Sequence, residues 1–174
     1  RRAKAVNFGI VYGQTAHWLG LQLGIPFAEA RDIIARYFAR YRGVESWIKG
    51  NLESARREVV VRTLYGRMRR LPDLAAKSRK LSGLAERAAG NTPIQGSAAD
   101  LIKAAMVRVF GGMKGPARLV LQVHDELLFE LPESEVGAFA PWVRTQMEEA
   151  VRLDVPIVVD LKVGKNWQDM EPLP

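Results

Sequence analysis

The stretch "LVLQVHDELLFELP", residues 119–132, places two apolar runs on either side of an acidic tip formed by His124, Asp125 and Glu126. Short apolar runs joined by polar residues predict two strands, over 117–123 and 126–131, that meet in a hairpin. A helical pattern over 132–152 and an apolar run over 155–164 follow, and they predict a helix and a final strand.

The residues before this hairpin are mostly helical in pattern. Apolar spacing, proline and glycine predict helices over 1–13, 15–23, 26–41 and 44–57, a break at Arg42-Gly43, and a small hairpin over 59–72. A longer helix is expected over 81–110, with a kink or break near Thr92 because Pro93 lies inside the pattern. A helical first half followed by strand, strand, helix and strand indicates an α+β fold.

The amino-acid composition excludes several kinds of site and favours one kind of binding partner. The chain has 174 residues, no cysteine and two histidines, so disulfides, thiolate zinc sites and histidine-rich metal sites are excluded. Any metal must be held by oxygen ligands, which favours Mg²⁺. No apolar run is long enough to predict a membrane span. The net charge of +7 favours a polyanionic partner such as nucleic acid, although a merely basic protein is the alternative.

One face of the opening helix combines cations and aromatic rings. Helical spacing places Arg1, Lys4, Phe8 and Tyr12 within an arc of about 80°. Cations beside stacking rings suit a nucleoside triphosphate, with charge for the phosphates and a flat surface for sugar and base. The alternative is that Phe8 and Tyr12 are core residues of a helix that is apolar around most of its circumference.

A second stripe is polar. Arg87, Asn91 and Gln95 are four residues apart, so they line one helical face that can hydrogen-bond a DNA duplex or its phosphates. A solvated helix face is the alternative. For the His124-Asp125-Glu126 tip, the alternative is an ordinary polar turn.

The opening "RRAKAVNFGIVYG" resembles the nucleotide-binding fingers helix of family A DNA polymerases, whose pattern is Lys-x-x-x-Phe/Tyr-Gly-x-x-Tyr-Gly. The resemblance implies that Lys4 binds the triphosphate, that Phe8 packs against the incoming nucleotide, and that Tyr12 and Gly13 lie by the template. The family leaves two residues between its arginine pair and the lysine, whereas "RRAK" leaves one. Arg1 then corresponds to the second arginine of the pair and is expected to help bind the nucleotide.

Three more segments are similar to the same family. "ERAAGNTPIQGSAAD" matches a segment in which Arg87, Asn91 and Gln95 are expected to contact primer–template DNA. "TLYGRMRRLPD" and "VPIVVDLKVGKNW" resemble a fingers segment and the closing strand.

"QVHDE" resembles the metal-binding hairpin of the family's palm. The resemblance implies that Asp125 binds catalytic metal, that Glu126 is an auxiliary carboxylate, and that His124 contacts nucleotide or primer. Nucleotidyl transfer needs carboxylates that hold two Mg²⁺ ions at the attacking and leaving oxygens. The expected catalytic residues are therefore the two carboxylates, Asp125 and Glu126, together with Lys4, which is expected to bind the triphosphate.

The family's second metal-binding aspartate, on an upstream strand, has no counterpart in this sequence. The other aspartates lie in unrelated contexts; they are Asp32, Asp73, Asp100, Asp154, Asp160 and Asp169. We therefore expect a C-terminal part of a polymerase, with fingers over 1–80 and the later palm over 81–174. The upstream palm and thumb would be a missing partner.

The resulting prediction is template-directed DNA synthesis from dNTPs on a primer–template, with two Mg²⁺ ions, in a cytoplasmic, nucleoid-associated bacterial or phage-type enzyme without a membrane partner. A catalytically incomplete DNA-binding module, or one half of a split polymerase, is the main alternative. A small RNA-binding protein is a third, but it requires stacking aromatic residues on an exposed sheet, and the sequence shows no such pattern.

Overall fold

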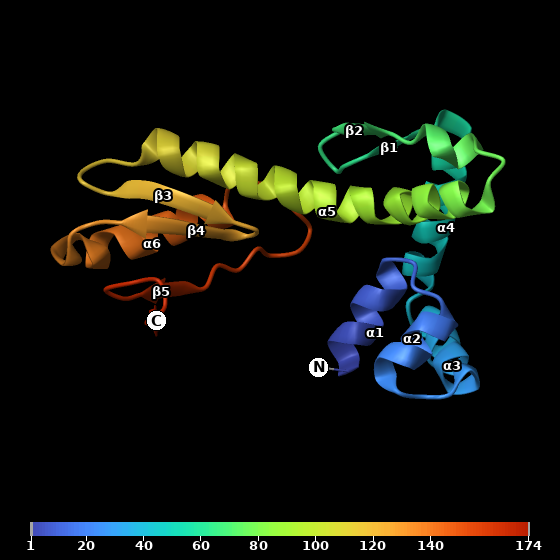
Figure 1. Cartoon of the computed structure of the whole chain (residues 1–174). Helices are drawn as coiled ribbons and strands as arrows, with labels where there is room; N and C mark the ends of the chain where they lie inside the picture. Colours follow the sequence, from blue (N-terminus) through green and yellow to red (C-terminus); the bar gives the residue numbers. More distant parts are fainter. Residues whose placement is uncertain (1, 174) are drawn as a thin grey trace. The chain divides into compact units, whose positions relative to one another are not determined.

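The computed structural model describes residues 2–173, apart from the side chains of residues 2 and 5 (Figure 1). It confirms the predicted α+β class, with several helices and small antiparallel sheets. The chain forms two compact units, Arg1–Ser97 and Ala98–Pro174. In the described part of the chain, no helix is both long and apolar enough to cross a membrane.

The first unit begins with a series of helices, and capping residues explain where some of them start and stop. They are α1 (Arg2–Val11), α2 (Ala16–Leu23), α3 (Phe27–Arg40) and α4 (Arg42–Glu58). The Thr15 hydroxyl accepts a hydrogen bond from the backbone N–H of Trp18 at the start of α2, and Gly24 ends that helix in the left-handed conformation. The break expected at Arg42-Gly43 lies one residue earlier, because the chain turns at Tyr41 and α4 already begins at Arg42.

A hairpin follows, formed by β1 (Val60–Arg62) and β2 (Met68–Arg70), and the short 3₁₀ helix η1 (Pro72–Ala75) comes after it. Small and branched apolar side chains from α4, from this segment and from the helix that follows it make a compact core. Its buried members are Ala55, Val61, Leu71 and Ala89, against which Leu52, Leu74 and Ala88 pack.

Helix α5 (Arg79–Gly112) runs without interruption through Pro93, so of the expected kink or break near Thr92 the break is wrong. Proline has no backbone N–H and its ring crowds the carbonyl four residues earlier, which here belongs to Ala89. The side-chain amide of Asn51, on α4, donates to that carbonyl oxygen at 2.9 Å. Ala89 is fully buried, so this bond satisfies an acceptor that water does not reach.

We expect Asn51→Ala to lower the free energy of unfolding by about 1–3 kcal/mol, because the buried Ala89 carbonyl loses its donor. In a Pro93→Ala background the loss should shrink to a few tenths of a kcal/mol, because position 93 regains a backbone N–H. Urea unfolding of the four proteins in this cycle measures the difference. Asn7→Ala on exposed α1 is the control, and an equal loss in both backgrounds would contradict the assignment.

The second unit contains the predicted central hairpin. Strand β3 (Arg118–Val123) pairs with β4 (Glu126–Glu130), and Val120 forms an irregularity in the register between Leu119 and Leu121. The 3₁₀ turn η2 (Glu133–Glu135) and helix α6 (Val136–Glu148) follow. The final strand is shorter than predicted: only β5 (Leu161–Val163) forms within 155–164, and it pairs with an unexpected β6 (Glu171–Leu173).

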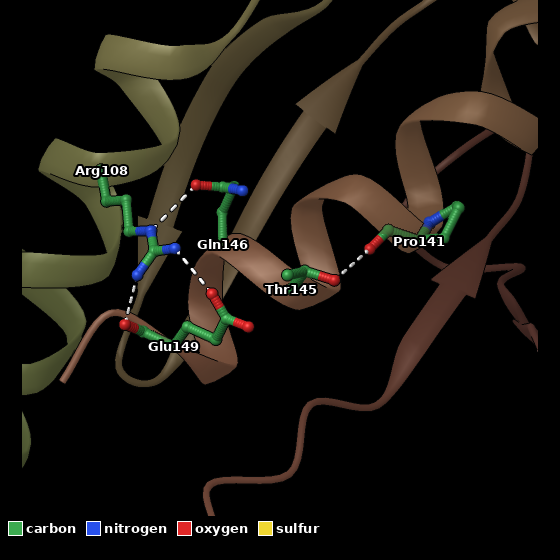
Figure 2. A network of polar contacts seen from close by, with 5 residues as sticks. All are labelled: Arg108, Pro141, Thr145, Gln146 and Glu149. Atoms are coloured by element: carbon green, nitrogen blue, oxygen red, sulfur yellow. Dashed lines mark hydrogen bonds and ion pairs between the residues drawn. The ribbon is translucent and has the colours of Figure 1, made fainter. Parts of the chain in front are cut away.

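Arg108 joins α5 to α6 (Figure 2). Its Nε donates to Gln146 Oε1 at 2.9 Å and its Nη2 to Glu149 Oε2 at 2.8 Å, while Nη1 donates to the Glu149 backbone carbonyl. The planar guanidinium meets three acceptors at once, which a lysine ammonium does not reproduce. On α6, the Thr145 hydroxyl donates to the Pro141 carbonyl at 3.0 Å.

Candidate functional site

The predicted cationic and aromatic face of α1 is present in the first unit. Lys4 Nζ lies 5.6 Å from the centroid of the Phe8 ring, and the Phe8 and Tyr12 rings are 5.7 Å apart. Phe8 is 48% exposed, so it is not a core residue, whereas Ile10 on the other side is 3% exposed. The helix therefore presents an ammonium and two rings together at its surface. Arg1, the fourth predicted member, lies outside the described residues.

Gln14 was not singled out from the sequence, yet it organises the end of α1. Its backbone N–H donates to Gly9 O at 2.7 Å, and its side-chain amide donates to Gln22 Oε1 on α2 at 3.0 Å. A Cβ at Gly9 would lie 2.0 Å from Gln14 Oε1, so this glycine leaves the space that the amide fills. Gly13 ends the helix at a positive φ of 75°. In the sequence, the one signal for this arrangement is the presence of glycine at positions 9 and 13.

The predicted polar stripe lies on α5, within the first unit. Arg87 and Gln95 are exposed and Asn91 is partly buried. Asn91 Oδ1 is buried and has no hydrogen-bond partner among the described residues. A buried acceptor of this kind is costly unless a donor reaches it. The stripe thus offers two exposed polar side chains, with a buried and unpaired acceptor between them.

The acidic tip in the second unit is a two-residue turn between paired Val123 and Glu126. His124 adopts a positive φ of 53°, which is uncommon for a residue with a side chain. The Gln122 amide donates to the His124 carbonyl at 2.5 Å and so restrains the turn from the preceding strand. The three tip side chains are exposed and adjacent, as the sequence predicts.

The tip offers oxygen ligands suited to Mg²⁺. Mg²⁺ sites in proteins commonly use one or two carboxylates and complete their shell with water and substrate phosphate. Asp125 and Glu126 fit the protein share of such a shell. Within residues 2–173, no group of three or more histidine, aspartate or glutamate side chains gathers as a metal site.

The positive φ of His124 can be tested by substitution. We expect His124→Val to destabilise the β3–β4 hairpin by about 1–2 kcal/mol, because a β-branched side chain is strained at positive φ. His124→Asn should stay close to the parent, since asparagine tolerates this conformation. Hydrogen exchange of the β3 and β4 amides measures the change. Equal protection in both variants would show that the turn does not depend on this backbone conformation.

Comparison with known proteins identifies the family of this chain. Residues 1–169 match the sequence profile described as DNA polymerase family A. The chain belongs to the family A DNA polymerases. The match covers α1, the α5 stripe and the acidic tip together, so the resemblance of separate motifs extends to the chain as a whole.

Individual relatives agree. The chain is 48% identical over 168 residues to "DNA polymerase I, thermostable" of Thermus filiformis, covering 96% of this chain and 20% of that protein. It is 45% identical over 172 residues to DNA polymerase I of Bacillus subtilis (strain 168), covering 97% of this chain and 20% of that protein. The chain thus spans about a fifth of the length of these relatives.

A solved structure is similar as well. It is described as the POL domain of Pol1 from M. smegmatis in complex with DNA primer-template and dNTP. The two folds agree with a TM-score of 0.83 at 44% sequence identity, over 90% of this chain and 28% of the other. A family A polymerase domain is therefore the fold to which this chain corresponds.

Proposed function

We propose that this chain is the fingers and later palm portion of a polymerase that copies DNA from dNTPs on a primer–template. The observation that carries the proposal is the grouping of Lys4 and Phe8 on α1 with the partly buried Tyr12 in the turn that follows, in a chain of the DNA polymerase family. The fingers are assigned to 1–80 and the palm to 81–174, and the enzyme is assigned to the cytoplasm and nucleoid of a bacterium or phage-infected cell.

In this proposal the α1 face binds the incoming nucleotide. The Lys4 ammonium neutralises part of the triphosphate charge, and Arg1 adds a second cation. Phe8 presents an exposed ring to the sugar and base, while Tyr12 and Gly13 lie beside the template. Closure of such a helix over a fitting base pair would complete the site only for the correct nucleotide.

The polar stripe holds the duplex in the same proposal. Arg87 suits a phosphate or a base edge, and Gln95 suits a base edge. The buried Asn91 Oδ1 has no partner among the described residues, and a rotation of this side chain toward the surface would let a nucleotide donor satisfy it. Both the stripe and α1 belong to the unit that holds most of the positive charge: residues 1–97 contain 18 of the 26 lysines and arginines and 7 of the 19 acidic residues.

The acidic tip supplies the chemistry of the reaction. Asp125 and Glu126 are proposed as Mg²⁺ ligands, and His124 as a contact to the nucleotide or primer end. When bound, two Mg²⁺ ions would stabilise negative charge on the attacking 3′-oxygen and the leaving pyrophosphate oxygen. The second aspartate that such a pair requires would come from an upstream palm segment that acts as the partner of this chain.

Asp125→Ala should abolish synthesis and leave DNA binding within a few-fold. The assay is Mg²⁺-dependent primer extension by a chimaera in which this chain replaces the matching segment of Bacillus subtilis DNA polymerase I. Losing a ligand of the catalytic metal should lower kcat by about 10³-fold or more, which corresponds to several kcal/mol. Asp154→Ala, at an exposed aspartate outside the hairpin, is the matched control. Equal loss of DNA binding and extension would contradict the metal role.

Lys4→Ala should raise the KM for dNTP by about 10- to 100-fold, because a charge-assisted contact to phosphate contributes about 1.5–3 kcal/mol. Steady-state extension by the chimaera at varied dNTP concentration measures this change. Lys49→Ala is the control, since that lysine pairs with Glu45 on α4. An unchanged KM in Lys4→Ala would remove Lys4 from the nucleotide site.

A DNA-binding module that does not catalyse is the second candidate. The positive charge concentrated in the first unit favours it, because this charge alone supports binding to a polyanion. The chimaera separates the two candidates. Extension that depends on Asp125 supports the polymerase, and DNA binding without extension supports the module.

A further inference from the structure

The β1–β2 hairpin has two chemically different faces. Successive side chains of a strand point to opposite sides, and directly paired residues share a side. Val61 pairs with Arg69, Val61 is 3% exposed, and Arg69 Nη1 donates to Thr92 Oγ1 on α5 at 3.0 Å. That side therefore faces α5. The other side carries Arg62 and Arg70, both exposed.

The loop of this hairpin is held firmly against α5. The Leu64 backbone N–H donates to Ser97 Oγ at 2.9 Å, and the Ser97 hydroxyl donates to the Pro93 carbonyl. A Cβ at Gly96 would lie 2.6 Å from Thr63 Cγ2, so the glycine allows this close approach. The loop is thus positioned before any ligand arrives, which lowers the entropic cost of binding.

The side chains at the loop end of the hairpin, two from the loop and Met68 from the start of β2, are exposed and largely apolar. Leu64 is 73% exposed, Met68 59% and Tyr65 46%. The Thr63 hydroxyl accepts from the backbone N–H groups of Tyr65 and Arg67, at 3.3 and 3.2 Å, so the loop backbone is ordered beneath these side chains. A tyrosine ring displayed in this way is a stacking surface for an unpaired base.

The two arginines on the outer face are not held in a direct ion pair. Among the described residues no ion pair joins Arg62 or Arg70 to an acidic side chain. The nearby Glu58 is already engaged: Ser54 donates a hydrogen bond to it, Arg57 lies 3.4 Å away, and these contacts, with the charges of Arg57 and Arg62, lower the pKa of Glu58. Arg62 and Arg70 are therefore available to an external anion.

We propose that Arg62 and Arg70 on the outer face of the β1–β2 hairpin, together with Tyr65 in its loop, form a binding site for single-stranded DNA. The arginines bind phosphates and Tyr65 stacks on a base, which is the combination that single-strand-binding surfaces use. None of these residues belongs to the α1 face, the α5 stripe or the acidic tip. The inference rests on the proposed function only in identifying the strand as unpaired template.

The test is fluorescence anisotropy with the full chain and a labelled oligothymidylate of about 20 nucleotides, titrated over a range of salt. Each phosphate contact on a single strand contributes about 0.7 to the slope of log K against log salt. Removing two contacts in R62Q/R70Q should lower the slope by about 1.4 and weaken binding roughly 10- to 30-fold at 0.1 M salt. Tyr65→Ala should weaken binding about fivefold or more, with the slope unchanged.

Two controls keep the result specific. R31Q/R36Q removes the same charge from exposed positions on α3, and it should change affinity far less. R62K/R70K keeps the charge and should keep the slope. If R62Q/R70Q behaves like R31Q/R36Q, or if the parent chain does not bind the oligonucleotide, the inference is overturned. If R62Q/R70Q has an altered circular dichroism spectrum, the single variants R62Q and R70Q replace it, each with an expected loss of about 0.7 in the slope.

A duplex of the same length identifies the ligand. Tyr65→Ala should leave duplex binding unchanged, because paired bases offer no free face; equal weakening on both substrates would overturn the assignment to single strands. The outcome is separable from the proposed function. A chimaera that fails to extend primers contradicts the polymerase and leaves the hairpin site standing, whereas equal affinities of the two double variants contradict the hairpin site and leave extension unaffected.

Discussion

The hydrogen bond from Asn51 to the Ala89 carbonyl is the contact on which the first unit depends. Without it, Pro93 would leave a buried acceptor unpaired in the middle of α5, and the helix would bend or end there. With it, α5 continues, and the residues on either side of Pro93 keep helical spacing. The stripe of Arg87, Asn91 and Gln95 is a single stripe only because this helix is unbroken.

The same stretch of α5 also supports the β1–β2 hairpin. Ser97 and Thr92 bond to it, and Gly96 allows its loop to come close. Once the inner side of a two-stranded hairpin is attached to a helix, strand alternation sends the other side chains outward. This is why a hairpin too small to be stable alone can present arginines and a tyrosine in a fixed arrangement.

Charge is divided between the two units along the chain. The first unit has a net charge of +11, whereas the residues from 98 onward carry four more acidic than basic side chains. In a family A DNA polymerase this division is chemically sensible. Binding a polyanion requires cations over a wide surface, while metal-dependent chemistry, which we propose for Asp125 and Glu126, requires only a few carboxylates at one place.

The α+β class, the exposed face of α1 and the acidic tip could be predicted from the sequence, because helical spacing, strand alternation and turn residues act over a few neighbouring positions. The roles given to Lys4 and Asp125 came from motif resemblance and stay predictions. Continuity of α5 through Pro93, the Gln14 contact with Gly9, and the short β5 with its partner β6 were not predictable in this way. Each depends on a partner distant in sequence, or on space left by a missing side chain, and only the tertiary structure brings such groups together.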